Sequence, residues 1–297
     1  MFSASIIWYL FFAGVGSGAS FTIFLIDSFL RRFKPQLFES LKALIAPGHA
    51  ISLALVVLST IFLVFDLGRI DRLLDLFIAP NLTILTIGAW SLLVYMILTD
   101  LQLLLRLRLP ATTHRYLHII VRWMTMLSAV AVMVYAGLLL KSLSSVHFWN
   151  TPLLPVLFVL SSLSSGLALV MLIGLFRQSA RVPLELFARF SRTHLPLLVC
   201  ELLLLVVYLF WAMQRSTTAA AAAVSLISGD YLVHFWGGVV VCGILLPSLI
   251  EAFAHRMTIS ILIAFHAIAI LVGAFALRYC FLMVGAPPQM LSPPLIM

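Results

Sequence analysis

The stretch YAGLLLKSLSSVHFWNTPLLP, residues 135–155, joins two long hydrophobic halves of a chain of 297 residues. It differs from both halves because hydrogen-bonding groups occur in it beside aromatic rings. These side chains are Tyr135, Lys141, His147, Trp149 and Asn150. Aromatic rings beside a few polar groups are typical of sites for flat, partly polar ligands. We therefore predict that this stretch lies at one face of a membrane and contacts a ligand there.

The composition is that of an integral membrane protein. Hydrophobic residues make up 63% of the chain and charged residues 9%, and the mean hydropathy is +1.18. A soluble domain needs a far more polar shell. Apolar runs of about 20 residues cross a bilayer core, and eight occur, at about 6–30, 49–65, 82–105, 118–141, 153–176, 194–213, 231–253 and 258–284. The sequence therefore predicts an all-α, multi-pass protein of the cytoplasmic (inner) membrane with eight transmembrane helices.

The charge pattern predicts the orientation of these helices. All but five of the 18 lysines and arginines lie in or beside the connections that follow odd-numbered spans; the five are Arg69, Arg72, Lys141, Arg215 and Arg278. Basic residues mark the inner side of a membrane, so both termini are predicted to lie outside. Anionic lipid accounts for the net charge of +8, and we expect the bilayer, not a nucleic acid, as the partner of these charges.

Small residues recur half a chain length apart. Gly14 and Gly18 lie four residues apart in AGVGSGAS, and aligning Gly18 with Gly166 also aligns Gly14 with Ser162 in SSLSSG. Both segments enter the membrane from the same side, which indicates a parallel duplication. We predict two side-by-side four-helix bundles, residues 1–142 and 143–297. Such stripes usually allow close helix packing, but the backbone at Gly14 could also line a ligand cleft.

A short amphipathic segment follows the second span. Residues 66–77 read DLGRIDRLLDLF, with apolar residues at i, i+3, i+4 and i+7. This spacing predicts an interfacial helix at about residues 67–77 on the outer surface. Asp66 and Arg69 flank Gly68 at the mouth of the span. A carboxylate there could exchange protons with the outside, and the arginine could hold it or polarise a ligand carbonyl.

A second set of ionisable residues lies in the inner half of the predicted spans: Asp27, His49, Asp100, His194, Glu201, Glu251 and His266. Such groups are costly inside a membrane and are therefore candidates for function. We predict a proton route from the inner side to the ligand, with Glu201 and His266 deeper, Asp27 and Glu251 close to the inner surface, and Asp100 and His49 as further members. Closed structural pairs are the alternative.

The cysteines give no sign of a redox centre. Cys200, Cys242 and Cys280 stand singly within predicted spans, without a ferredoxin-like or CxxCH spacing. We predict that the protein itself holds no iron–sulfur cluster, no haem and no metal site. A b-type haem held by two inner histidines remains an alternative, with His49, His118, His194 and His266 as candidates.

Four stretches together resemble the NrfD-like family, the polysulfide reductase membrane-subunit family. They are DLGRIDRLLDLF, YAGLLLKSLSSVHFWNTPLLPVLFVLSSLSSGLAL, GILLPSLIEAF and LVGAFALRYCFLMVGAP. The resemblance implies two four-helix bundles with both termini outside, anchoring a respiratory molybdopterin oxidoreductase. It also implies menaquinone or menaquinol as the bound substrate. The implied partners are an iron–sulfur subunit with ferredoxin-like clusters on the outer face and a molybdopterin catalytic subunit.

The resemblance also assigns roles to residues. Tyr135 matches a tyrosine that contacts the quinone head-group, and Asp66 and Arg69 match polar groups at its outer edge. Relatives can supply asparagine and histidine from the start of the first span, where this chain reads SIIWYL, residues 5–10. Quinol oxidation releases two electrons and two protons, so a proton acceptor is needed. We predict His147 for this role, and Lys141, Trp149, Gly14 and Trp8 as further cofactor contacts.

A transporter or ion channel without redox chemistry is the alternative of a different class. The internal repeat and the buried carboxylates would suit it. The sequence has no paired spans broken by glycine or proline at matching mid-membrane positions, and its polar groups gather towards one face. These features favour a redox subunit, which would copurify with an iron–sulfur protein.

Overall fold

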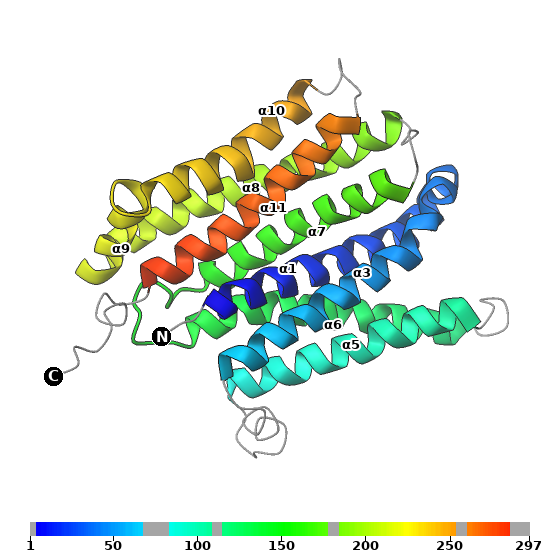
Figure 1. The fold of residues 1–297 in the computed structure, drawn as a ribbon, viewed down its shortest axis with the longest axis horizontal. Coiled ribbons are helices and arrows are strands. Elements are labelled where there is room, and N and C mark those ends of the chain that lie inside the picture. The colour runs from blue at the N-terminus through cyan, green and yellow to red at the C-terminus, as the bar shows by residue number, and fades with distance from the viewer. Residues whose placement is uncertain (1–3, 68–82, 109–114, 178–183, 254–259, 286–297) are drawn as a thin grey trace.

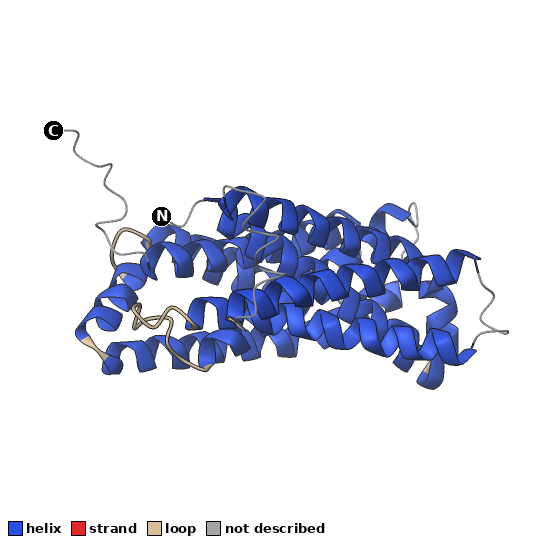
Figure 2. Cartoon of the chain, turned by 90° about the horizontal axis from the view of Figure 1, so that it is seen from below, coloured by secondary structure: helices blue, strands red, loops and turns tan. Residues whose placement is uncertain are grey.

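The computed structural model describes residues 4–67, 83–108, 115–177, 184–253 and 260–285, which are helical with short turns and contain no strand (Figures 1 and 2). The elements are α1 (Ala4–Leu25), the π-helical turn η1 (Ile26–Leu30), α2 (Arg31–Phe33), α3 (Pro35–Leu67), α5 (Ile84–Arg108), α6 (Arg115–Lys141), α7 (Leu153–Arg177), α8 (Leu184–Arg215), α9 (Thr217–Ile227), the π-helix η2 (His234–Leu245), α10 (Leu246–Phe253) and α11 (Ser260–Gly285). The predicted all-α class is confirmed.

Eight helical segments in the described part of the chain are long and apolar enough to cross a membrane. They are Ser5–Phe33, Leu41–Asp66, Ile84–Arg108, Tyr116–Lys141, Leu153–Phe176, His194–Arg215, His234–Ala252 and Ile261–Gly285. The predicted number of spans is therefore confirmed. The helices α3 and α8 begin well before the spans predicted within them. An apolar run marks only the part of a helix that can cross the membrane, and it does not include the more polar first turns.

The helix α9 was not predicted. It has 11 residues, about half of what a bilayer crossing requires, so a search for spans passes over it. Its five consecutive alanines favour a helix. Ser216 caps its start, where the side chain accepts a hydrogen bond from the backbone N–H of Ala219 at 3.2 Å.

The long helices run side by side, with α1 and α7 in the middle (Figure 1). The helix α1 packs against α3, α6 and α7, while α11 packs against α7 and η2. The start of α1 and the end of α11 lie at the same end of the molecule. We refer to it as the outer end, following the predicted topology. The division into two four-helix bundles stays a prediction, and the interfacial helix at about 67–77 lies outside the described residues.

The glycines of the two small-residue stripes bring α1 and α7 into backbone contact. A Cβ atom on Gly18 would lie 1.9 Å from the carbonyl oxygen of Ser162, and one on Gly166 would lie 2.1 Å from the carbonyl carbon of Gly18. No larger residue fits at either position without separating the helices. The stripes therefore meet each other at the crossing of α1 and α7, which is the close packing that such spacing indicates.

The connection between α6 and α7 is fastened to the second half of the chain. Trp149 is completely buried, and its indole N–H donates a hydrogen bond of 2.8 Å to the carbonyl oxygen of Phe281 on α11. The hydroxyl of Tyr208 on α8 donates to the carbonyl oxygen of Phe148. This predicted ligand-contacting stretch is thus anchored at the outer end by buried aromatic residues.

Candidate functional site

Two buried tyrosines lie together near the outer end. Tyr135 comes from α6 and Tyr9 from α1, and their side chains are close enough to interact electrostatically. Their exposed fractions are 3% and 1%. The two hydroxyls interact with each other, and neither bonds any other residue in the described part of the chain. A phenol hydroxyl can both donate and accept, so the pair keeps hydrogen-bonding capacity for a polar ligand atom or a water molecule.

A glycine on a third helix makes room for this pair. The ring of Tyr135 lies over Gly88 of α5, where a Cβ atom would fall 1.8 Å from the ring. The position of Tyr135 is therefore fixed by three helices. Tyr135 was predicted as the principal site residue, whereas Tyr9 was not. Tyr9 could have been found from its position in residues 5–10, the stretch from which relatives can supply polar contacts to the head-group.

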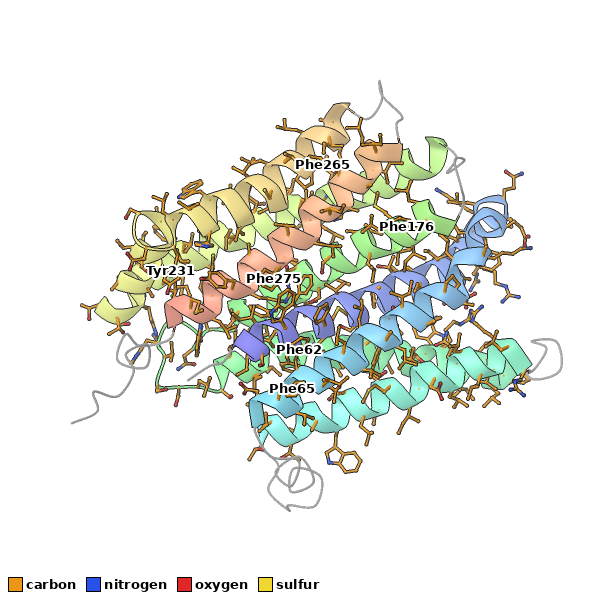
Figure 3. All side chains as sticks on the ribbon, in the orientation of Figure 1. Phe62, Phe65, Phe176, Tyr231, Phe265 and Phe275 are labelled. Carbon is orange, nitrogen blue, oxygen red and sulfur yellow. The ribbon has the colours of Figure 1, made fainter. Side chains whose placement is uncertain are left out.

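Trp8 precedes Tyr9 but lies on the outside of the helices. It is 38% exposed, and its ring centroid lies 4.6 Å from that of Phe275 on α11 and 5.5 Å from that of Phe12. Phe62 of α3 stacks on Phe12 at 5.8 Å, and Figure 3 labels Phe62 and Phe275 on their helices. These rings form a partly exposed aromatic cluster beside the tyrosine pair, made of Trp8, Phe12, Phe62 and Phe275, in which Trp8 is exposed and the three phenylalanines are half-buried.

The remaining residues predicted for the outer site occupy different environments. Lys141 is half-buried at the end of α6, and His147 is exposed in the connection that follows. Asp66 is half-buried near the end of α3, and Arg69 lies outside the described residues. Trp149 serves as the anchor described above. A part for any of them in ligand binding stays a prediction.

Arg278 was counted among the outer-face charges, and this placement is wrong. It is completely buried within α11. Its Nε donates to the carbonyl oxygen of Leu10 on α1 at 3.1 Å, and its Nη2 donates to Oγ of Ser162 on α7 at 3.0 Å. A Cβ atom on Gly14 would lie 2.4 Å from that Nη2, so Gly14 provides the space for the guanidinium. A buried charge needs such hydrogen bonds.

Glu201 of α8 lies near Arg278 in the middle of the helices. It is buried and interacts with Arg278 and with the hydroxyl of Ser161. A small cavity adjoins it, with room for roughly one water molecule. Its polar lining comes from Ser161, Ser164 and Glu201, and its other lining residues are Val239, Gly243, Ile244, Ile270, Gly273 and Ala274.

Closer to the inner end, two imidazoles converge on one carboxylate. His194 Nδ1 lies 3.0 Å from Oε1 of Glu251, and His266 Nε2 lies 3.2 Å from the same oxygen. The second nitrogen of His194, Nε2, lies 2.8 Å from Oγ of Ser164 on α7. All four side chains are buried. The cluster can therefore share protons between a carboxylate, two imidazoles and a hydroxyl.

The other ionisable residues predicted for the proton route are placed separately. The carboxylate of Asp27 accepts a hydrogen bond from Arg106 and forms an ion pair with Arg122, whose Nη1 lies 3.1 Å from Oδ2. His49 Nε2 lies 3.1 Å from Nε2 of Gln102. Asp100 is exposed. The structure therefore gathers Glu251 and His266 around His194, with Glu201 nearby, and leaves Asp27 in an ion pair of the kind that the structural alternative expects.

Three of the four candidate haem ligands contact other side chains. His194 and His266 both point at Glu251, with their rings perpendicular and the centroids 5.5 Å apart. His49 contacts Gln102 instead. These three rings are engaged by other side chains, and the absence of a haem stays a prediction.

Comparison with known proteins gives the family. The family model described as polysulphide reductase, NrfD, matches residues 1–287. Protein NrfD of Escherichia coli (strain K12) is 27% identical over 308 aligned residues, which cover 95% of each chain. The C chain of the polysulfide reductase of Wolinella succinogenes is 26% identical over 298 residues, 93% of this chain and 92% of that one. A Protein NrfD homolog of Haemophilus influenzae is 31% identical over 156 residues, 51% of this chain and 48% of that one. The predicted resemblance is confirmed, and the chain belongs to the NrfD polysulphide reductase family.

Proposed function

We propose that the chain is the membrane-anchor subunit of a respiratory oxidoreductase in the cytoplasmic (inner) membrane, and that it binds menaquinone or menaquinol between α1 and α6. The supporting observation is the pair of buried hydroxyls of Tyr9 and Tyr135, which interact with each other and with no other residue in the described part of the chain. Family membership supports the anchor role, because one relative is named as part of a polysulfide reductase. It also favours a redox subunit over a transporter or channel.

The chemistry of the tyrosine pair suits a quinone head-group. A phenol hydroxyl can both donate and accept a hydrogen bond, so it can serve a quinone oxygen and a quinol hydroxyl alike. Both hydroxyls are covered in this conformation, and ring entry requires neighbouring side chains to move. The partly exposed aromatic cluster around Trp8 lies directly beside Tyr9 and offers a lipid-soluble carrier an apolar surface from the bilayer.

The electrons need a further carrier. Oxidation of menaquinol yields menaquinone, two electrons and two protons, and the cysteines of this chain are single. We assign the electrons to an iron–sulfur subunit with ferredoxin-like clusters, docked at the outer end near the tyrosine pair. A molybdopterin subunit would complete the complex. Both partners come from the family resemblance.

Phenylalanine substitutions test the quinone site. Tyr135→Phe and Tyr9→Phe each remove one hydroxyl and little volume, so each should weaken binding of a menaquinone analogue by about 3- to 10-fold, the equivalent of one hydrogen bond. Binding is measured by fluorescence titration with 2-heptyl-4-hydroxyquinoline N-oxide on membranes that contain the intact complex. The matched control is Tyr95→Phe, because Tyr95 is equally buried and its hydroxyl already bonds Ser20 at 2.7 Å. Unchanged affinity for the analogue in both test variants would mean that the head-group binds elsewhere. The two tyrosine hydroxyls would then bond a bridging water molecule instead.

A further inference from the structure

We propose that Ser164 of α7 is the link in a buried proton relay that joins His194 to Glu201. The relay connects the inner end of the helices with the middle of the second half of the chain. The proposal rests on the proposed function, because protons must be moved when a quinol is oxidised or a quinone reduced. It adds a hydroxyl and a histidine that sequence analysis did not place in a proton route.

The inner part of the relay is already hydrogen-bonded. Glu251 lies in the last turns of α10, which ends opposite the outer end (Figure 1). Its Oε1 contacts His194 Nδ1 at 3.0 Å, and His194 Nε2 contacts Ser164 Oγ at 2.8 Å. The imidazole thus uses both ring nitrogens, one towards a carboxylate and one towards a hydroxyl. This is the arrangement in which a histidine passes a proton through its ring.

The middle part of the relay crosses the small cavity. Glu201 lies seven residues after His194 on α8, a rise of about 10 Å, which is too far for a direct hydrogen bond. Ser164 and Glu201 both line the cavity, together with Ser161, and the cavity has room for roughly one water molecule. A buried water needs two to four polar partners, and these three side chains provide them.

Glycines create this space between the helices. Gly243 of η2 and Gly273 of α11 touch through their backbones, and a Cβ atom on Gly273 would lie 2.1 Å from the Cα of Gly243. Both line the cavity. Gly243 belongs to the π-helical η2, and it lines the cavity. Such π-helical irregularities are frequent at functional sites. The backbones of Gly243 and Gly273 therefore form part of the cavity wall, beside the polar side chains that would hold the water.

Arg278 closes the outer end of the relay. Its guanidinium stays protonated, so it cannot carry a proton onward, but it supplies a positive charge next to Glu201. The same guanidinium is hydrogen-bonded to the carbonyl oxygen of Leu10, the residue after Tyr9. Glu201 is therefore the terminal acceptor, and Arg278 is a positioning residue between the relay and the tyrosine pair.

The transfer balances with one proton. A proton leaves the carboxyl group of Glu251 for Nδ1 of His194, and the imidazole releases one from Nε2 to Oγ of Ser164. Ser164 gives its own hydroxyl proton to the cavity water, and the water gives one to the carboxylate of Glu201. His194, Ser164 and the water regain their original composition. The net change is the movement of one proton from Glu251 to Glu201.

The test compares two neighbouring serines. Ser164→Ala removes the link. Ser165→Ala is the matched control, because Ser165 is equally buried and, within the described ranges, its hydroxyl donates to carbonyl oxygens of its own helix, at 2.7 Å for Ser161 and 3.3 Å for Ser162. Difference infrared spectroscopy of the intact complex in liposomes follows hydrogen–deuterium exchange of the Glu201 carboxyl band, which is identified by its loss in Glu201→Gln.

We expect Ser164→Ala to slow this exchange by about 100-fold or more, the effect of losing a positioned proton carrier, and Ser165→Ala to leave it unchanged. His194→Gln, which keeps a polar contact but cannot pass a proton, should slow exchange as Ser164→Ala does. Wild-type exchange rates in both variants would overturn the relay. So would a stoichiometric divalent metal bound by the two histidines and Glu251, because imidazole and carboxylate groups also hold such ions.

The same samples separate this proposal from the quinone site. Binding of 2-heptyl-4-hydroxyquinoline N-oxide should stay within about twofold of wild type in Ser164→Ala, since no direct contact with the head-group is removed. Wild-type complex that fails to bind the analogue would refute the quinone site, while the carboxyl exchange would still decide the relay. Normal binding with unaltered exchange in the variants would refute the relay alone.

Discussion

At the scale of single residues, glycines on neighbouring helices make room for the large polar side chains of the interior. Gly88 leaves space for the ring of Tyr135, and Gly14 leaves space for the guanidinium of Arg278. A methyl group at Gly88 would collide with Tyr135 of the proposed quinone site, and one at Gly14 would collide with Arg278 beside the proposed relay. Glycine is needed at these positions for close approach and not for a special backbone conformation.

Gly88→Ala should therefore act through Tyr135. The added Cβ atom would lie 1.8 Å from the tyrosine ring, so the ring must move and the hydroxyl moves with it. We expect analogue binding to weaken by about 10-fold, at least as much as in Tyr135→Phe, with an additional loss of stability of about 1–3 kcal/mol from overpacking. Gly174→Ala is the control, because a Cβ atom there meets Leu44 at an ordinary 3.4 Å. Tight analogue binding by Gly88→Ala would mean that the ring position of Tyr135 does not matter.

The partners of these residues were not visible in the sequence for a physical reason. The spans are apolar around most of their circumference, so periodicity does not say which face of one helix meets which face of another. Tyr135 was found because a family resemblance singled it out, whereas its neighbour Tyr9 could not be paired with it across helices. Arg278 was misplaced because a lone arginine in a span is normally taken to reach the surface.

At the scale of elements, length and apolarity predicted the eight spans well, because the bilayer sets a fixed length requirement. The same criterion passed over α9 and the polar beginnings of α3 and α8. The connection between α6 and α7 shows a different limit. Its aromatic residues predicted a ligand contact, but the indole of Trp149 is buried and hydrogen-bonded to α11. Sequence gives the residue type in such a connection, whereas packing decides which way the ring points.

Trp149→Phe tests the anchoring of this connection. The substitution removes the hydrogen bond to Phe281 and leaves a buried carbonyl oxygen without its donor, which costs about 1–3 kcal/mol. We expect a lower thermal unfolding midpoint of the purified complex and faster proteolysis within residues 142–152. Trp123→Phe serves as the control, because Trp123 is nearly half exposed on α6. Equal midpoints for the two variants would show that the connection does not depend on this bond.

At the scale of the whole molecule, the polar groups divide between the two ends. The tyrosine pair lies near the end where α1 begins, and the cluster of His194, Glu251 and His266 lies towards the opposite end, with Glu201 and Arg278 between them. The functional interpretation depends on which end faces the outside. The proposed iron–sulfur partner would dock near the proposed quinone site, and the proposed relay would open to the other compartment. The charge pattern predicts this orientation from the positive-inside rule.

Chemical labelling decides the orientation. In a background without the three native cysteines, Ser145→Cys places a thiol in the exposed connection at the predicted outer end, and Gln36→Cys places one on the exposed first turn of α3, before the span Leu41–Asp66, at the predicted inner end. A membrane-impermeant maleimide is added to cells whose outer membrane has been made permeable and whose inner membrane is intact. It should label the thiol at position 145 within minutes. The thiol at the predicted inner end should react only after the inner membrane is permeabilised. The expected contrast follows from the positive-inside rule. Labelling in the reverse order would put the tyrosine pair beside the cytoplasm, and the iron–sulfur partner would then have to dock from that side.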